Sequence, residues 1–176
     1  MRKLVESTFV TLDGVISSPE EWGPPYWDEE HNGYAHNLLF ASDALLLGRE
    51  TYQGFAEAWP TRKGDDFADR INSLPKFVAS TSLQETKWNA TLIKDDVAGK
   101  VAKLKEQPGQ NILKFGTGQL DLTLMEHDLI DEFHFWVFPV VVGSGQRLLD
   151  GVEVTLTLLG TTTFGSGIVV HTYTPR

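Results

Sequence analysis

The chain has no cysteine among its 176 residues. This absence excludes disulfides, thiolate nucleophiles and cysteine–zinc sites, and a reducing compartment is the expected environment. The longest apolar run, residues 133–142, contains His134 and Pro139 and is too short to span a bilayer. The first three residues lead directly into a strand-like run, without the apolar centre that a signal peptide needs. We therefore expect a cytoplasmic protein with no membrane partner.

Positive charge is also scarce, because 15 Lys and Arg residues face 24 Asp and Glu residues and give a net charge of −9. This balance argues against nucleic acid as a partner, since nonspecific binding depends on Lys and Arg meeting phosphates. An anionic small ligand would need a local basic patch, with Arg49, Lys76, Lys114 and Arg147 as candidates. The five histidines show no metal-ligand spacing, so no metal site is predicted.

Short apolar runs alternate with helix-type segments along the whole chain, and its length fits a single domain, residues 1–176. The alternation predicts an α/β fold with a mostly parallel sheet and helices on both faces. The predicted strands are 3–12, 43–47, 76–80, 91–93, 111–115 and 130–142, and a hairpin of 155–162 and 168–174 adds antiparallel strands at one edge. The predicted helices are 34–41, 49–58, 65–74, 95–106 and 119–127, and residues 17–32 are predicted to be a loop.

The segment Gly116-Thr117-Gly118 is the most informative local pattern, because it joins a predicted strand directly to a predicted helix. Glycine lets the backbone approach a ligand closely, and the free N–H groups of a new helix favour an anion. The pattern is not the dinucleotide-binding fingerprint of Rossmann folds, since Asp121 stands where a third glycine would be. A phosphate-bearing cofactor and a plain tight turn are both consistent with this segment alone.

Two further strand ends offer similar chemistry. Gly48-Arg49-Glu50-Thr51 places a cation and a hydroxyl in the first turn of a helix after a buried strand. Ser80-Thr81-Ser82 places small hydroxyl groups where open α/β sheets bind ligands. Because the carboxyl ends of parallel strands meet at one edge of the sheet, the three segments are expected to converge there.

With these segments the chain resembles a known family, the dihydrofolate reductase-like superfamily. It is most similar to the branch typified by the C-terminal reductase domain of the bifunctional riboflavin-biosynthesis deaminase/reductase. The resemblance spans nearly the whole chain in family order. It rests on residues 7–17, 48–52, 76–82, 115–120 and 129–132, together with Pro139 and residues 143–145. It implies a three-layer α/β/α sandwich with a mixed sheet.

The resemblance also implies NADPH as the cofactor, with NADH as the alternative. Residues Gly48, Arg49 and Thr51 would hold phosphates on the adenosine side, and Ser80 and Thr81 would adjoin the adenine ribose and its 2′-phosphate. The pyrophosphate would be wrapped by Gly116, Thr117, Gly118, Gln119 and Leu120. The nicotinamide and substrate end would be formed by Phe9, Thr11, Asp13 and Gly14 and closed by Glu132, with Trp22 or Trp27 as a cover.

The sequence departs from the family pattern at two places. Many relatives carry an arginine beside the position of Thr81, whereas here the run Ser80-Thr81-Ser82 has no cation. A 2′-phosphate then lacks its bidentate partner, which weakens the case for NADPH over NADH. A zinc deaminase domain is absent, because the chain has no Pro-Cys-x-x-Cys motif. A complete bifunctional riboflavin enzyme is therefore ruled out.

Two functions follow as hypotheses. The first is an NAD(P)H-dependent reductase of a small heterocyclic or sugar-like substrate, acting on a C=N or C=O group and resembling 5-amino-6-(5-phosphoribosylamino)uracil reductase. Its catalytic candidate is Asp13, which would hold the substrate or relay a proton, unless it serves only as an Asp-Gly turn residue. The second is a non-catalytic nucleotide- or heterocycle-binding protein, favoured by the lack of paired carboxylates or an activated nucleophile. A homodimer through residues 133–142 and burial of that run within one chain are equally good interpretations of its apolar character.

Overall fold

The computed structural model describes residues 1–176, and all eight strands form one sheet. The strands are β1 (Leu4–Thr11), β2 (Ser42–Gly48), β3 (Lys76–Ala79), β4 (Ala90–Ile93), β5 (Asn111–Phe115), β6 (Glu132–Phe138), β7 (Leu156–Thr163) and β8 (Val169–Pro175). The helices are α1 (Pro19–Trp22), the 3-10 turn η1 (Pro24–Tyr26), α2 (Glu29–Phe40), α3 (Arg49–Ala58), α4 (Asp66–Ser73), α5 (Val97–Glu106) and α6 (Gln119–Glu126).

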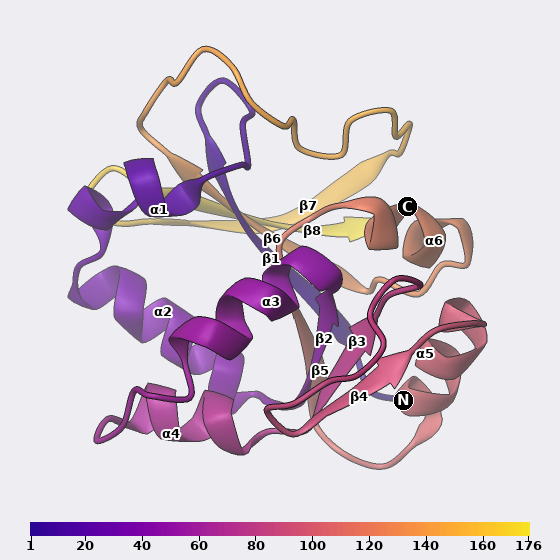
Figure 1. Cartoon of the computed structure of the whole chain (residues 1–176). Coiled ribbons are helices and arrows are strands. Elements are labelled where there is room, and N and C mark those ends of the chain that lie inside the picture. The colour runs from indigo at the N-terminus through magenta and orange to yellow at the C-terminus, as the bar shows by residue number, and fades with distance from the viewer.

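The strand order is β4-β3-β2-β5-β1-β6-β8-β7. The first six of these strands, β4 to β6 in this order, are parallel to one another. At the edge of the sheet, β8 is antiparallel to β6 and β7 is antiparallel to β8. Helices α2, α3 and α4 cover one face of the sheet, and α5 and α6 cover the other (Figure 1). The predicted three-layer sandwich with a mixed, mostly parallel sheet and an antiparallel edge hairpin is confirmed.

The central strand β2 explains why the sheet is buried on both faces. Its residues Leu45 and Leu47 belong to the apolar core beneath α2, α3 and α4, whereas Ala44 and Leu46 belong to the core beneath α5. An uninterrupted apolar run is what a parallel strand covered on both sides requires. A third core of aromatic side chains, which includes Trp136, lies between α1, α2 and the terminal hairpin.

The helix starts differ in a way that positions the site. Asp28, Asp65 and Asp96 each cap a helix by accepting a hydrogen bond from a backbone N–H in its first turn. In contrast, α3 begins after Gly48 and α6 after Gly118, neither of which has a capping side chain. Several first-turn N–H groups of these two helices therefore lack an intrahelical partner at the carboxyl ends of β2 and β5.

Two predictions about local structure were wrong. Residues 17–32 are not only a loop, because α1, η1 and the start of α2 lie within them. Pro19 and Pro24 begin α1 and η1, since the fixed φ of proline suits a first helical position. The strand predicted for 130–142 ends at Phe138, and it lies inside the sheet between β1 and β8. Residues 132–138 are therefore covered within one chain, whereas Val141 and Val142 beyond them are exposed. No helix has both the length and the apolar character needed to cross a bilayer.

Candidate functional site

A cavity of about 530 Å³ lies at the carboxyl ends of β2, β3 and β5. All ten residues predicted to contact the cofactor line it: Gly48, Arg49, Thr51, Ser80, Thr81, Gly116, Thr117, Gly118, Gln119 and Leu120. The three strand ends that the sequence singled out therefore meet in space. That these residues bind a cofactor stays a prediction.

The start of α3 forms one wall of the cavity. The Arg49 side chain, 47% exposed, donates a hydrogen bond from Nη1 to Ser82 Oγ over 3.0 Å. This contact brings a guanidinium group against the hydroxyl run at the end of β3. Arg49 also lies 3.9 Å from Glu50, but an exposed pair of this kind contributes little. The guanidinium group is therefore available to an anionic ligand.

A second cation, Lys94, lines the same cavity just after β4. The Ser80 N–H donates to the Ile93 carbonyl over 3.1 Å, so the ends of β3 and β4 are joined beside the cavity. Lys94 was not among the predicted cofactor-binding residues, although it directly follows the predicted strand 91–93. Arg49 and Lys94 together supply positive charge that the run Ser80-Thr81-Ser82 lacks.

The glycine turn, residues 116–118, forms the opposite wall. Gly116 has φ +73°, a left-handed conformation that favours glycine, and its N–H donates to the Ser7 carbonyl over 2.9 Å. A Cβ on Gly116 would lie 3.4 Å from Thr51 Oγ1, so this turn adjoins the start of α3. Thr117 Oγ1 is buried and has no hydrogen-bond partner.

Beneath the glycine turn lies a buried cluster that consists of Glu6 of β1, Lys114 of β5 and Asp121 of α6. Their side chains are 0%, 3% and 0% exposed, respectively. Lys114 Nζ lies 2.9 Å from Asp121 Oδ2 and 3.1 Å from Glu6 Oε2, and it also donates to the Gly116 carbonyl. Asp121 Oδ2 accepts a hydrogen bond from the Gly118 N–H over 2.6 Å. The cluster thus holds both ends of the glycine turn from below.

The charges of this cluster perturb one another. Burial raises the pKa of Glu6 well above its ordinary value, and the neighbouring Asp121 adds to this, although Lys114 opposes it. Burial alone would lower the pKa of Lys114, but the attraction of the Glu6 and Asp121 carboxylates outweighs burial and raises that pKa. Lys114 is therefore charged at neutral pH, and the two acids compete for one cation.

Residues 2–170 match the family model described as the RibD C-terminal domain. The chain belongs to this family. A relative from Bacillus subtilis (strain 168), the uncharacterized protein YyaP, is 30% identical over 180 residues that cover 98% of this chain and 94% of YyaP. The match includes every segment that lines the cavity and ends at the start of β8.

Solved structures share the fold of this chain. A protein from Shewanella sp. PV-4, whose description assigns it provisionally to riboflavin biosynthesis, superimposes with a TM-score of 0.72 at 21% identity, covering 99% of each chain. Dihydrofolate reductase from Enterococcus faecalis, complexed with NADP(H) and RAB-propyl, superimposes with a TM-score of 0.64 at 13% identity, covering 99% of this chain and 96% of that one. At these identities the likeness establishes the dihydrofolate reductase-like fold.

Three predicted substrate-end residues of this RibD C-terminal domain lie at the exit of β1, outside the lining of the cavity. Asp13 accepts hydrogen bonds from Thr11 Oγ1 over 2.6 Å and from the Gly143 N–H over 2.8 Å, and these bonds lower its pKa. Thr11 in turn accepts from the Val15 N–H, and Gly14 has φ +86°. These contacts tie the β1 exit to the loop after β6. They give Asp13 a structural role, alongside which its catalytic role remains a prediction.

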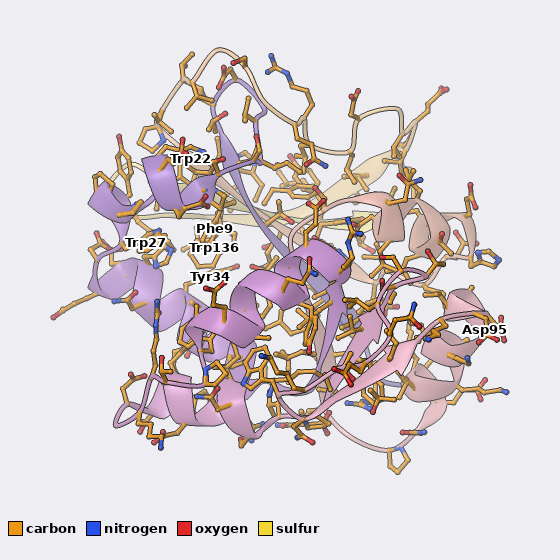
Figure 2. The ribbon with its side chains drawn as sticks, viewed as in Figure 1. Phe9, Trp22, Trp27, Tyr34, Asp95 and Trp136 are labelled. Carbon is orange, nitrogen blue, oxygen red and sulfur yellow. The ribbon has the colours of Figure 1, made fainter.

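Phe9 and Trp22 belong to the aromatic core (Figure 2). Trp22 is 8% exposed and its ring centroid lies 5.1 Å from that of Phe138, so it packs as a core residue. Trp27 is 44% exposed and stacks on His31 at 5.9 Å. Of the two tryptophans, Trp27 is therefore the one with a free face.

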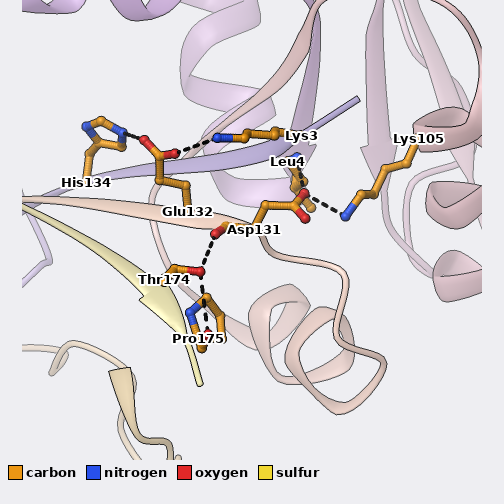
Figure 3. A network of polar contacts seen from close by, with 8 residues as sticks. All are labelled: Lys3, Leu4, Lys105, Asp131, Glu132, His134, Thr174 and Pro175. Carbon is orange, nitrogen blue, oxygen red and sulfur yellow. Dashed lines mark hydrogen bonds and ion pairs between the residues drawn. The ribbon is translucent and has the colours of Figure 1, made fainter. Parts of the chain in front are cut away.

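Glu132 lies at the amino end of β6, where it is paired with Val5 of β1, whereas the cavity lies at carboxyl ends. Its Oε1 contacts His134 Nε2 at 2.7 Å and its Oε2 lies 3.4 Å from Lys3 Nζ (Figure 3). Neighbouring Asp131 pairs with Lys105 at 2.6 Å. The structure therefore does not bring Glu132 to the cavity, and its contact with substrate, which rested on the family resemblance, stays a prediction.

Proposed function

We propose that this RibD C-terminal domain is an NAD(P)H-dependent reductase of a small heterocyclic or sugar-like substrate, acting on a C=N or C=O group. The reaction would resemble that of 5-amino-6-(5-phosphoribosylamino)uracil reductase. The observation that carries the proposal is the convergence of Gly48–Thr51, Ser80–Ser82 and Gly116–Leu120 on one cavity. Family membership supports the reductase class.

The cavity fits a dinucleotide in its chemistry. A Cβ at Gly48 or Gly118 would meet no protein atom within 4 Å, so space beside both helix starts is open to a ligand. The N–H groups at the starts of α3 and α6 are donors for phosphate oxygens. When bound, the reduced nicotinamide would supply the hydride.

We favour NADPH over NADH because two cations lie at the end of the cavity formed by β3 and β4. Arg49, through its contact with Ser82, and Lys94 adjoin the segment that would face the adenine ribose. A 2′-phosphate carries a charge of about −1.5 to −2 at neutral pH, so a guanidinium and an ammonium group together suit it. These residues replace the arginine that many relatives carry beside Thr81.

The chain's own contribution to the reaction would be position and exclusion of water. Correct orientation of two reactants contributes roughly 7–11 kcal/mol to lowering a barrier. The glycine turn, fixed from below by Lys114 and Asp121, would set the depth of the pyrophosphate and hence the position of the nicotinamide. We propose Trp27 rather than Trp22 as the cover of a planar substrate, because Trp22 is buried in the aromatic core whereas Trp27 is 44% exposed and stacks on His31.

Asp13 needs a test of its own, because its carboxylate is already engaged by the loop after β6. If Asp13 acts on the substrate, Asp13→Asn lowers kcat at unchanged NADPH affinity and unchanged thermal stability. If it serves only to join the loops, the same variant lowers the melting temperature and leaves kcat of the folded enzyme near that of the wild type.

The experiment that tests the proposal is titration of the protein with NADPH and NADH. Energy transfer from tryptophan to bound reduced nicotinamide reports binding, and the loss of reduced-nicotinamide absorbance with candidate heterocycles reports turnover. Binding with turnover supports the reductase. Binding without turnover of any candidate favours the alternative, a nucleotide- or heterocycle-binding protein. The scarcity of catalytic side chains around the cavity supports the same alternative. No heat and no thermal stabilisation by any nicotinamide nucleotide would refute the reductase.

A further inference from the structure

The buried cluster of Glu6, Lys114 and Asp121 has two acids and one base in a space that water does not reach. Glu6 Oε2 and Asp121 Oδ1 are both buried without a hydrogen-bond donor, even though Glu6 Oε2 lies 3.1 Å from the Lys114 ammonium group. The two atoms are close enough for an ion pair, but their geometry is not that of a hydrogen bond. Two buried carboxylates around a single cation leave one uncompensated negative charge, which is costly in a low-dielectric interior.

One additional proton would balance the cluster, and its location follows from the contacts. Asp121 Oδ2 already accepts hydrogen bonds from the Gly118 N–H and from Lys114. Glu6 accepts only from the Thr8 hydroxyl, at 2.6 Å on Oε1. A protonated Glu6 would donate to Asp121, which would provide a partner for a buried oxygen that otherwise has none.

We propose that Glu6, Lys114 and Asp121 form a proton-sharing cluster that sets the anion affinity of the glycine turn, with the proton on Glu6 in the state that binds. The inference rests on the proposed function, in which this turn holds the pyrophosphate. Glu6 is a positioning residue here, because it acts on the turn only through the other two members. Its role goes beyond cofactor contact, since none of its atoms needs to touch the ligand.

The link from Glu6 to the turn is short. Lys114 contacts Glu6 on one side and the Gly116 carbonyl on the other, whereas Asp121 holds the Gly118 N–H. Loss of the Glu6 proton changes the cluster from net neutral to −1 directly below groups that would face a phosphate. It also draws Lys114 toward Glu6 and away from Gly116. Both effects weaken binding of an anion.

The groups that act on Glu6 are few, so its titration can be separated from others. Lys114 of β5 and Asp121 of α6 are the charged groups that act on it, β1 adds the Thr8 hydroxyl, and the residue paired with Glu6 on β6 is the apolar Phe133. The raised pKa of Glu6, caused mainly by burial, is consistent with a proton held above the ordinary range of glutamate. Affinity for an anion should then fall by up to about tenfold per pH unit above that pKa.

The test is a titration with NADPH between about pH 6 and pH 10, well above the ordinary glutamate pKa, for the wild type, Glu6→Gln and Glu126→Gln. Gln mimics the protonated acid, and Glu126 is an exposed glutamate on the same helix as Asp121. We expect the Kd of the wild type and of Glu126→Gln to rise with pH, and the Kd of Glu6→Gln to lack that rise. Equal pH dependence in all three proteins overturns the inference.

A second probe separates this inference from the proposed function. Inorganic pyrophosphate is titrated over the same pH range by thermal shift. If pyrophosphate shows the Glu6-dependent pH effect while no nicotinamide nucleotide binds, the proposed cofactor is wrong and the cluster stands. If neither ligand binds at any pH, the turn is not an anion site and both ideas fail.

A third measurement needs no variant. Carboxyl-carbon NMR of protein labelled at glutamate should show one glutamate that remains protonated well above the ordinary range. If every glutamate in the wild type titrates near its ordinary pKa, Glu6 holds no proton and the cluster does not work as proposed. This result decides the question even if Glu6→Gln fails to fold.

Discussion

Replacing Lys114 by methionine should cost about 3 kcal/mol of unfolding free energy, at the low end of the roughly 3–5 kcal/mol seen when one partner of a buried ion pair is removed. Methionine keeps most of the aliphatic length but removes the ammonium group. The Asp121 carboxylate then remains buried at 0% exposure, and the Gly116 carbonyl loses a donor. The low end applies because Asp121 keeps its bond from the Gly118 N–H.

The assay is urea unfolding at neutral pH, followed by tryptophan fluorescence. For a domain of this size, each 1 kcal/mol corresponds to roughly 2–4 °C, so the melting temperature of Lys114→Met should fall by about 6–12 °C. Lys103→Met is the matched control, because Lys103 is exposed on α5 and surface changes usually stay within about 0.5 kcal/mol. Adding Asp121→Asn to Lys114→Met should recover part of the loss, since it removes the stranded charge.

A loss of less than about 1 kcal/mol in Lys114→Met, within the range of an ordinary substitution, would refute the reasoning. It would mean that water reaches the cluster or that Asp121 is neutral without its partner. An additive double variant would refute it as well, because neighbours in one ion-pair network should show a coupling energy of about 0.5–3 kcal/mol.

Three further predictions concern the cavity, a buried lysine and the sheet edge. Arg49→Met and Lys94→Met should each raise the Kd for NADPH by about threefold to tenfold, because each removes one partly exposed charge-assisted contact. The Kd for NADH should rise less. Equal effects on both nucleotides in fluorescence titrations would contradict the 2′-phosphate assignment. Burial lowers the pKa of Lys76 from 10.5 to about 8, so the unfolded chain binds more protons between those values. The unfolding free energy should therefore rise with pH from about 8 to about 10.5, by at most about 1.4 kcal/mol per unit, and Lys76→Met should not show this rise. A homodimer would use β7, an exposed edge strand without a single charged residue; light scattering should then report a dimer for the wild type and a monomer for Leu158→Lys, and a wild-type monomer would contradict it.

The cavity could be predicted from the sequence because each of its walls is a local feature. A buried strand that stops at glycine and continues as a helix is recognisable at Gly48 and at Gly116–Gly118. Parallel pairing, which the alternation of elements implies, then places these stops at one edge. Neither the strand-to-helix pattern nor the parallel pairing depends on contacts between side chains that are far apart in the sequence.

The buried cluster could not be predicted, because its members come from three segments and their contacts depend on register. Glu6 is paired with Lys114 only because Leu4 of β1 is aligned with Ile112 of β5. One signal was nevertheless present. Lys114 stands between Leu113 and Phe115 in a strand expected to be buried on both faces, where a charge requires a partner. Lys114 was considered only as a candidate for a local basic patch.

The contacts of the substrate end could not be predicted for a similar reason. Asp13 was recognisable as an Asp-Gly turn residue, but the amide groups of 142 and 143 that it binds lie 129 and 130 residues away. Glu132 was assigned to this end only by the family resemblance. In the structure it lies at the amino end of β6, a strand of seven residues, whereas the cavity lies at carboxyl ends of strands.

The buried cluster is difficult to explain as a device for stability. Buried ion pairs are often no better than apolar side chains of similar volume, because desolvation offsets their attraction. An apolar core would serve β1, β5 and α6 equally well, and the same sheet face already packs Leu4, Ile112 and Leu124. What apolar residues lack is a donor for the Gly116 carbonyl and an acceptor for the Gly118 N–H. Those two contacts hold the glycine turn toward the cavity, so the cluster is better understood as part of the anion site than as part of the core.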